Sequence, residues 1–473
     1  MVLQNWINGQ FVEAHGSGRL EVISPVTEAV VAVSPISDSH DVDAAYAAAE
    51  AARLAWRRTT PGQRQQMLLA WADAIEGAAD ELVEAQYRNT GQPRDAIRAE
   101  EVMTGADHVR FFAGAARTLG GVASGEYMEG HTSQVRREPI GVVGQVTPWN
   151  YPIMMAIWKL APALAAGNTV VIKPSDTTPE STLVLVRLTK GILPDGVVNL
   201  VLGDASTGAL LTSHRTPGLV AITGSVRAGL AVAEAAAGNL ARAHLELGGK
   251  APAVVFSGVD VEATAEGIVG AAFFNAGQDC TAVTRVLVAR EIHDDVVAAL
   301  VAAAQALVVG NVEDAYYGPM NNRVHFTKVM EILAALPEHA VVATGGNRIG
   351  EQGFYIEPTI VTGVKQDDSI VQTETFGPVI TVQAFDSEAE AVTLANGVDY
   401  ALAASVWTRD VAQAARLAAD IDAGCVWINT HIPLVAEMPH GGFKHSGYGK
   451  DLSVYGLEDY TRIKHVMTAT EAS

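Results

Sequence analysis

The order of apolar and polar residues along the chain predicts helices that alternate with short strands. Residues 41–56 place Val42, Ala45, Ala49 and Ala52 at helical spacing on one face. A second helix is expected over 61–86, where the segment starts with a proline. Short apolar runs predict strands at 141–146, 169–172, 197–202, 219–222, 252–256 and 285–288. Helices are predicted between and after these strands at 153–166, 179–190, 261–276 and 294–309, and from Ser225 onward.

Short apolar strands separated by helices of this length form βαβ units. The fold class is therefore expected to be α/β, with parallel sheets that carry helices on both faces. Residues 132–137 alternate as an edge strand does, and an exposed strand edge favours pairing with another strand.

Composition narrows the possible partners. The 473 residues include 32 Lys and Arg against 53 Asp and Glu, a formal net charge of −21. This balance argues against nucleic acid or an anionic membrane as a partner, because basic surfaces bind phosphate groups. No uninterrupted apolar run of about 20 residues predicts a membrane helix, and residues 1–10 do not resemble a signal peptide. The two cysteines exclude a disulfide scaffold and favour a reducing, cytoplasmic location.

One of the two cysteines has the surroundings of a reactive thiol. Cys280 ends the segment NAGQDC, follows the predicted helix end at Gly277 and has polar neighbours on both sides. Cys425 lies in an apolar, strand-like run and is interpreted as a packing residue. A second candidate is Glu246 in LELGGK, a single carboxylate at the end of an apolar strand. Proton transfer and pairing with Lys250 are both open interpretations of Glu246.

Two loops at predicted strand ends indicate a ligand site, although the chain contains no GxGxxG fingerprint. TGSVRAG at 223–229 opens a helix, where Gly224 and Ser225 can hold a pyrophosphate. KPSD at 173–176 places Lys173 and Asp176 at the carboxyl end of a strand, where parallel sheets bind ligands. A simple helix cap and a solvated loop are the alternatives.

Taken together, six motifs in chain order resemble those of the NAD(P)-dependent aldehyde dehydrogenase superfamily. They are TPWNYP at 147–152, KPSD at 173–176, TGSVRAG at 223–229, LELGGK at 245–250, NAGQDC at 275–280 and ETFGP at 374–378. The resemblance runs from residue 6 to the tail. Segments at 110–117, 125–131 and 437–451 are most similar to the 4-aminobutanal dehydrogenase branch, a neighbour of the betaine aldehyde dehydrogenases.

The resemblance implies oxidation of an aldehyde to a carboxylic acid through a cysteine thiohemiacetal and thioester. Cys280 would be the nucleophile, Asn150 with the Cys280 backbone N–H would stabilise the oxyanion, and Glu246 would activate the hydrolytic water. It also implies NAD binding by Thr147, Pro148, Trp149, Lys173, Ser175, Asp176, Gly224, Ser225, Gly229, Leu247, Glu374 and Phe376. The family more often has Glu where this chain has Asp176; an acid here favours NAD, and NADP stays open.

The substrate expected from the resemblance is an ω-aminoaldehyde such as 4-aminobutanal. Its ammonium group would need anionic or aromatic side chains. The candidates are Asp107, Trp158, Asp279 and Trp427, each of which has a plain structural alternative as a turn cap, a solvated residue or a core residue. Betaine aldehyde or another polar or aromatic semialdehyde is the alternative substrate. The segment Thr430-His431-Ile432, where betaine aldehyde dehydrogenases tend to carry an aromatic residue, disfavours betaine aldehyde.

Three other classes of protein explain the sequence less well. A cofactor-free cysteine hydrolase leaves the nucleotide motifs unexplained, and a catalytically inactive scaffold of the same fold is testable by NADH formation. No metal is expected, because His440 and His445 share a glycine-rich loop without ligand spacing.

The resemblance finally implies a Rossmann-type cofactor domain over 1–121 and 142–247 and an α/β catalytic domain over 248–450. A β-hairpin arm over 122–141 and 451–473 would assemble a homo-oligomer, a dimer of dimers.

Overall fold

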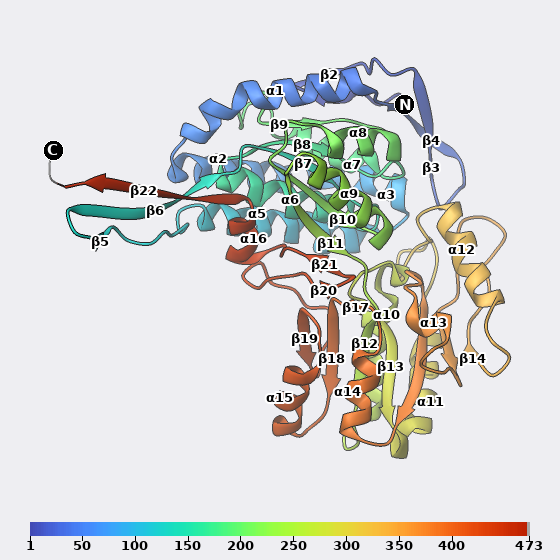
Figure 1. Cartoon of the computed structure of the whole chain (residues 1–473). Coiled ribbons are helices and arrows are strands. Elements are labelled where there is room, and N and C mark those ends of the chain that lie inside the picture. The colour runs from blue at the N-terminus through green and yellow to red at the C-terminus, as the bar shows by residue number, and fades with distance from the viewer. Residues whose placement is uncertain (471–473) are drawn as a thin grey trace.

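The computed structural model describes residues 1–470 and shows two lobes with a projecting arm (Figure 1). The first lobe is built on an eight-stranded sheet in the order β2-β1-β9-β8-β7-β10-β11-β21. Its strands are β1 (Asn5–Ile7), β2 (Gln10–Val12), β7 (Val142–Val146), β8 (Thr169–Lys173), β9 (Val198–Leu200), β10 (Leu219–Gly224), β11 (Arg242–Leu247) and β21 (Gly447–Tyr448). The strands from β9 to β11 are parallel, as the sequence predicts.

Helices cover both faces of this sheet, which explains why its strands are apolar throughout. On one face, side chains such as Val142, Val171 and Val220 pack under α1 (Ser39–Arg58), α8 (Ala205–Ser213) and α9 (Val226–Gly238). On the other face, alternate residues such as Val143 and Val170 pack against the remaining helices. These are α2 (Pro61–Gly77), α3 (Ala79–Thr90), α5 (Thr104–Ala115), α6 (Pro152–Ala166) and α7 (Pro179–Arg187).

The second lobe has a seven-stranded sheet in the order β14-β15-β16-β13-β12-β18-β19, in which β14 alone is antiparallel to its neighbour. Its strands are β12 (Ala251–Val255), β13 (Val283–Ala289), β14 (Val341–Thr344), β15 (Thr359–Thr362), β16 (Val379–Phe385), β18 (Ala403–Trp407) and β19 (Cys425–Ile428). One face carries α10 (Val261–Phe273), α11 (His293–Gln305) and α12 (Arg323–Ala334), and the other α14 (Glu388–Asn396) and α15 (Val411–Asp420). The fold class is therefore α/β, as expected.

Several helix ends differ from the prediction. The helix expected over 61–86 is interrupted at Ala78, whose backbone leaves the helical region (φ −105, ψ 18), so that α2 and α3 are separate. The helix expected over 261–276 ends at Phe273, because Asn275 (φ 49) and Ala276 (φ 57) adopt left-handed conformations. Helices α7 and α11 also end three and four residues short of their predicted ends at 190 and 309.

The arm is a three-stranded sheet of β5 (Gly125–Met128), β6 (His131–Pro139) and β22 (Thr461–Ala469) that projects from the first lobe (Figure 1). Strand β22 pairs with β6 along its whole length, from Thr461 opposite Pro139 to Ala469 opposite His131. The expectation that residues 132–137 form an edge strand is therefore wrong, since β6 is the central strand. The free edges belong to β5 and β22.

A separate ribbon of β3 (Gly18–Ile23) and β4 (Val30–Ile36) reaches the second lobe beside α12 (Figure 1). Glu28 in its turn pairs with Arg323 and with Arg348, and the Phe354 N–H donates to the Pro25 carbonyl at 3.1 Å. The two lobes are thus joined at a second place, far in sequence from the strand connection between β11 and β12. Among residues 1–470, no helix is both long and apolar enough to cross a membrane.

Candidate active site

Four neighbouring parallel strands of the first lobe end at the same sheet edge. Thr147 follows β7, Lys173 ends β8, Gly224 ends β10 and Leu247 ends β11. The strand order β8-β7-β10-β11 brings these ends side by side, with the predicted loops that continue from them. This is the edge at which open parallel sheets bind ligands.

Unpaired polar atoms mark this edge as a binding surface. In the described part of the chain, the buried hydroxyls of Thr147 and Thr223 have no hydrogen-bond partner. Buried polar atoms are normally paired, so both hydroxyls are available to a bound ligand. Ser225 caps α9 by accepting from the Ala228 N–H at 3.3 Å. The other N–H groups of the first turn have no partner within the helix.

The Lys173 and Asp176 loop lies at the neighbouring strand end. Lys173 Nζ donates to the carbonyls of Pro174 (2.8 Å) and Gly203 (2.9 Å), and burial lowers the pKa of Lys173 to about 8. Asp176 is partly exposed and accepts a 3.2 Å hydrogen bond from Ser175 Oγ. The Asp176 side chain is thus accessible to the hydroxyls of a ligand, whereas Ser175 is buried and the Lys173 ammonium is held by backbone carbonyls.

Gly229 has a different role from the one expected. A Cβ at this position would lie 2.5 Å from the side chain of Leu247. Gly229 therefore allows α9 to pack closely on β11, and its effect on a ligand at the sheet edge is indirect. The close packing of α9 on β11 still fixes the position of the Ser225 cap.

The second lobe completes the surface. Glu374 Oε1 accepts from the Gly249 N–H at 2.8 Å, and burial raises the pKa of Glu374 to about 7. A Cβ on Gly248 would lie 2.3 Å from the Glu374 carboxylate, so this turn accepts only glycine without movement. Trp149, which follows Pro148 after β7, packs edge-on against Phe376 with ring centroids 5.3 Å apart. These contacts place residues of both lobes at one site.

A network of amides fixes the loop that carries Cys280. Asn150 Nδ2 donates to the Gln278 carbonyl at 3.1 Å, two residues before the cysteine. The Asn150 carbonyl accepts from Gln92 (2.8 Å) and Asn275 (2.9 Å), and Gln92 also donates to Asn275 Oδ1 at 2.9 Å. The left-handed turn at Asn275 and Ala276 is therefore held from both sides, and the Asn150 amide lies beside the loop that carries Cys280.

Cys280, Glu246 and His440 meet in space, with their Sγ, carboxylate and ring nitrogen atoms all within 4.8 Å of one another. Burial, and then the carboxylates of Glu246 and Asp279, raise the pKa of the Cys280 thiol well above its ordinary value. The thiol form is therefore favoured, and thiolate formation needs a base or a nearby positive charge. Cys425 is also partly exposed, and it packs on the same small apolar cluster as Cys280 and Trp427.

Cys280 opens onto a cavity of about 140 Å³. The polar and aromatic side chains that line it include Glu100, Thr104, His108, Asn150, Tyr151, Trp158, Phe274, Asp279 and His440. Two of the four residues expected to contact substrate, Trp158 and Asp279, line this cavity. Asp279 also caps its turn through Thr281, at 2.6 Å to N and 2.7 Å to Oγ1, so the structural alternative holds as well.

The other two expected substrate residues do not line the cavity. Asp107 is exposed on α5, whereas its neighbour His108 lines the cavity, because one residue along a helix rotates the side chain by about 100°. Trp427 lies beneath the cavity wall, where its Nε1 donates to the Pro433 carbonyl at 3.0 Å. Trp427 therefore shapes the segment 432–434 that lines the cavity.

Sequence reasoning missed Glu100, Thr104 and His108 as cavity residues. They recur every fourth residue along η1 (Ile97–Met103), a π-helix, and the following α5, and so share one face. That spacing was readable in the sequence, but nothing there indicated which face was buried against α6. His440 was missed for a different reason, since its partners are distant in the chain.

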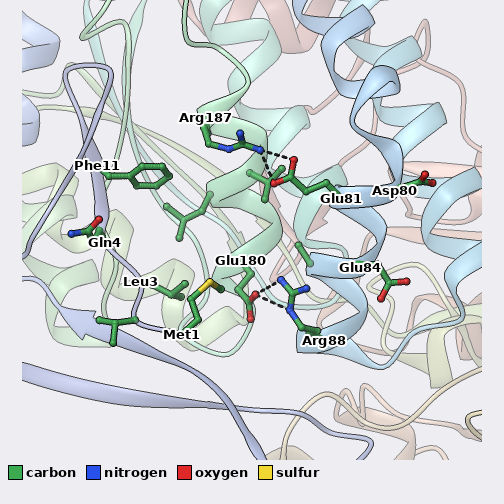
Figure 2. Close-up of a pocket in the computed structure, with 14 residues that line it drawn as sticks. Met1, Leu3, Gln4, Phe11, Asp80, Glu81, Glu84, Arg88, Glu180 and Arg187 are labelled. Carbon is green, nitrogen blue, oxygen red and sulfur yellow. Dashed lines mark hydrogen bonds and ion pairs between the residues drawn. The ribbon is translucent and has the colours of Figure 1, made fainter.

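A larger cavity of about 650 Å³ lies between the N-terminal strands and helices α3 and α7 (Figure 2). Ion pairs cross it from Arg187 to Glu81 at 2.6 Å and from Arg88 to Glu180 at 2.5 Å (Figure 2). Its lining shares no residue with the Cys280 cavity and includes neither cysteine nor histidine. Reactive side chains converge on the smaller cavity, which is therefore the candidate active site.

Comparisons with known proteins agree with this geometry. The sequence profile of the "Aldehyde dehydrogenase family" matches residues 11–466. The chain is 38% identical to a betaine aldehyde dehydrogenase of Bacillus subtilis over 98% of this chain and 97% of that protein. It is 40% identical to an aldehyde dehydrogenase of Emericella nidulans over 98% of this chain and 94% of that protein.

Solved structures extend the agreement to the fold. The structure of PnpE in complex with nicotinamide adenine dinucleotide superposes with a TM-score of 0.97 at 37% identity, covering 100% of this chain and 99% of that one. A Staphylococcus aureus betaine aldehyde dehydrogenase in complex with NAD⁺ gives a TM-score of 0.96 at 34% identity, covering 99% and 95%. The family profile and these relatives span nearly the whole chain. This chain therefore belongs to the aldehyde dehydrogenase family.

Proposed function

We propose that this enzyme oxidises an ω-aminoaldehyde, such as 4-aminobutanal, to its carboxylic acid with NAD. The observation that carries the substrate proposal is the charge of the cavity, because the carboxylates of Glu100 and Asp279 line the same space as Cys280. An ammonium group at the end of a short substrate is attracted to carboxylates and to the faces of aromatic rings such as Tyr151 and Trp158.

The reaction proposed begins when Cys280, after losing its proton, attacks the aldehyde carbon. The Asn150 amide and the Cys280 backbone N–H would stabilise the negative oxygen that results. NAD, when bound, supplies the acceptor for the hydride that leaves this carbon. Water then attacks the thioester carbonyl and gives its proton to Glu246, while the C–S bond breaks and Cys280 is regenerated.

The cofactor would lie on the sheet edge where both lobes contribute. Its chemistry fits the residues present, since the unpaired hydroxyls of Thr147 and Thr223 and the Ser225 cap suit phosphate and ribose oxygens. Thr147, Pro148, Trp149, Lys173, Ser175, Asp176, Gly224, Ser225, Leu247, Glu374 and Phe376 would form the binding surface, with Gly229 packing behind it. Asp176 favours NAD, because its carboxylate would repel the 2′-phosphate of NADP.

Betaine aldehyde is the second candidate substrate, because relatives with that name span the whole chain. The cavity offers three aromatic rings, from Tyr151, Trp158 and Phe274. The wall segment 432–434 is Ile-Pro-Leu and adds no aromatic ring. The cavity therefore lacks a complete aromatic cage for a trimethylammonium group. A primary ammonium group therefore fits the carboxylate-lined cavity better.

We also propose a homo-oligomer, a dimer of dimers assembled by the arm. Strand β22 has a free edge, and Ile463 and Met467 on it are exposed (67% and 45%). Exposed apolar residues beside a free edge favour pairing with a second copy.

The domain division expected from the sequence stays a proposal. Strand β21 belongs to the expected catalytic segment 248–450, but it pairs with β11 and extends the sheet of the first lobe. A cytoplasmic location, which suits two free thiols, also stays a proposal.

An initial-rate panel tests the proposed function. NADH formation is followed with 4-aminobutanal, betaine aldehyde and butanal, each with NAD and NADP. We expect the highest kcat/KM with 4-aminobutanal and NAD. Preference for betaine aldehyde would select the second candidate, and absence of NADH with every aldehyde would favour an inactive scaffold.

A further inference from the structure

His440 lies at the centre of the candidate active site without a role in the proposed reaction. Its side chain is buried, and its Nε2 lies 3.4 Å from Glu246 Oε1. The Cys280 sulfur lies in the same group of atoms. An imidazole is the side chain that exchanges protons most readily near neutral pH.

Two contacts position the His440 ring. Its backbone exchanges hydrogen bonds with Asp451, at 2.9 Å from the His440 N–H and 2.7 Å to its carbonyl. Its ring packs on Trp158 with centroids 5.0 Å apart at 60°. Trp158 is itself fixed, because its Nε1 donates to His108 Nδ1 at 3.0 Å. A ring positioned this firmly can face Glu246 without a bond of its own.

The side-chain atoms of His440 and Glu246 that face each other have no hydrogen-bond partner. Within residues 1–470, both ring nitrogens of His440 and both carboxylate oxygens of Glu246 are buried without a hydrogen-bond partner, since their 3.4 Å contact lacks bonding geometry. Such groups are rare in folded proteins and are typical of sites that exchange protons or bind ligands. A small rotation of the Glu246 side chain would bring the two groups into a hydrogen bond.

The charged neighbours of this pair come from several elements. Cys280 faces Glu246 from the nucleophile loop, and Lys450 acts on Glu246 through its charge from the segment before α16 (Ser453–Asp459). His108 lies behind Trp158 on α5, and the charge of Glu437 acts on it. His440 Nε2 lies 3.4 Å from the Glu246 carboxylate, within reach of proton transfer after a small side-chain movement.

We propose that His440 is the proton relay of Glu246. This inference rests on the proposed function of Cys280 and Glu246. In thioester hydrolysis, the water O–H bond breaks as the new C–O bond forms, and the proton passes to Glu246. The proton then moves from the Glu246 carboxyl to His440 Nε2, which returns Glu246 to its basic form. His440 next gives the proton to the Cys280 sulfur, whose bond to carbon has broken, so that Cys280 is regenerated as the thiol. His440 acts through Glu246 and is therefore a positioning and relay residue.

The test compares His440→Phe, which keeps an aromatic ring against Trp158, with the matched control His445→Gln. His445 lies on the same segment, and its exposed side chain contacts Asp399 at 3.8 Å. NADH formation from butanal and NAD is followed through the first turnover and the steady state. We expect His440→Phe to keep the first-turnover burst and the KM for butanal, and to lose about 10²-fold in steady-state kcat. His445→Gln should match the parent enzyme.

Two further readouts separate a relay from a structural role. In a double-mutant cycle, Glu246→Gln with His440→Phe should be no slower than Glu246→Gln alone, because both changes remove one proton path. Substituted imidazoles should restore turnover to His440→Ala, with rate constants that rise with their basicity. Thermal unfolding checks each variant, and His440→Gln, which keeps polarity but relays no proton, replaces any variant that does not fold.

Additive losses in the cycle, or no rescue of folded His440→Ala by imidazoles, would overturn the relay. An unchanged kcat in His440→Phe would overturn it as well. Failure of the proposed function has a different signature, namely full turnover in Cys280→Ala or in Glu246→Gln. The two ideas can therefore fail separately.

Discussion

Tyr151 donates a 2.8 Å hydrogen bond from its hydroxyl to Asp279 Oδ2, which joins the loop after β7 to the residue beside the nucleophile. Burial, and then the Asp279 charge, raise the pKa of Tyr151 well above its ordinary value, so the phenol stays a donor. The hydrogen bond therefore fixes the orientation of the Asp279 carboxyl group in the cavity. This is the carboxyl group that we propose attracts the ammonium group of the substrate.

Removing the cavity carboxylates should weaken selection of a charged substrate. We expect Asp279→Asn and Glu100→Gln each to lower kcat/KM for 4-aminobutanal about 10-fold, equivalent to about 1.4 kcal/mol. Activity with butanal should fall less than activity with 4-aminobutanal, because butanal carries no ammonium group. Asp107→Asn is the control, since Asp107 lies outside the cavity. Equal losses for both aldehydes would reject the ammonium site.

The alkylation rate of Cys280 should depend on pH and on NAD. Because burial and the carboxylates of Glu246 and Asp279 raise the pKa of Cys280, the free enzyme should react slowly with iodoacetamide at neutral pH and faster as pH rises. Addition of NAD should increase the neutral-pH rate through the positive charge of the nicotinamide ring. Peptide mapping distinguishes Cys280 from Cys425. Rapid alkylation of the free enzyme at pH 7 would contradict the predicted direction.

Loss of the Asn150 amide should slow the chemical steps. Asn150→Ala removes one oxyanion donor, for which we expect a decrease in kcat of about 10²–10³-fold. Its backbone carbonyl also binds Gln92 and Asn275, so a backbone-preserving substitution leaves those bonds in place. Stopped-flow measurement of the NADH burst checks this prediction. A change in KM alone would assign Asn150 to substrate binding.

The buried ion pair of Lys159 and Asp451 should control stability. Burial alone would raise the pKa of Asp451, but Lys159 and His244 together outweigh it and lower that pKa. A depressed carboxyl pKa contributes stability above the unfolded value of about 4, and this contribution is lost as pH falls further. We expect Lys159→Met to destabilise the protein by about 3–5 kcal/mol, because the buried Asp451 carboxylate loses its lysine partner and keeps only His244. Thermal unfolding at pH 7 and pH 4 measures this loss of stability. The double variant Lys159→Met with Asp451→Leu should recover stability.

Local sequence patterns predicted much of the fold. Continuous apolar runs such as β7 and β8 indicated parallel strands covered on both faces, and their carboxyl ends located the loops of Thr147 and Lys173. The backbone turn at Ala276 was not predictable, because alanine carries no preference for a left-handed conformation. The central position of β6 depends on its pairing with β22, which lies at the far end of the chain.

The substrate side of the site was harder to predict than the reacting groups. Cys280, Glu246 and Asn150 lie in short sequence motifs that can be identified without knowledge of the fold. The cavity wall instead comes from helix faces, so the choice between Asp107 and His108 depended on helical phase. His440 reaches Glu246 only because its segment pairs with Asp451 and packs on α6, which are long-range contacts that spacing does not reveal.

Trapping the thioester on Cys280 tests whether Cys280 is the nucleophile and Glu246 the hydrolytic base. Glu246→Gln should oxidise butanal once and then hydrolyse slowly, because the base for the attacking water is missing. Mass spectrometry of this variant, quenched after mixing with butanal and NAD, should show one butanoyl group on the Cys280 peptide and one NADH per active site. NADH formation with Cys280 unmodified, or with the acyl group on another residue, would contradict the account.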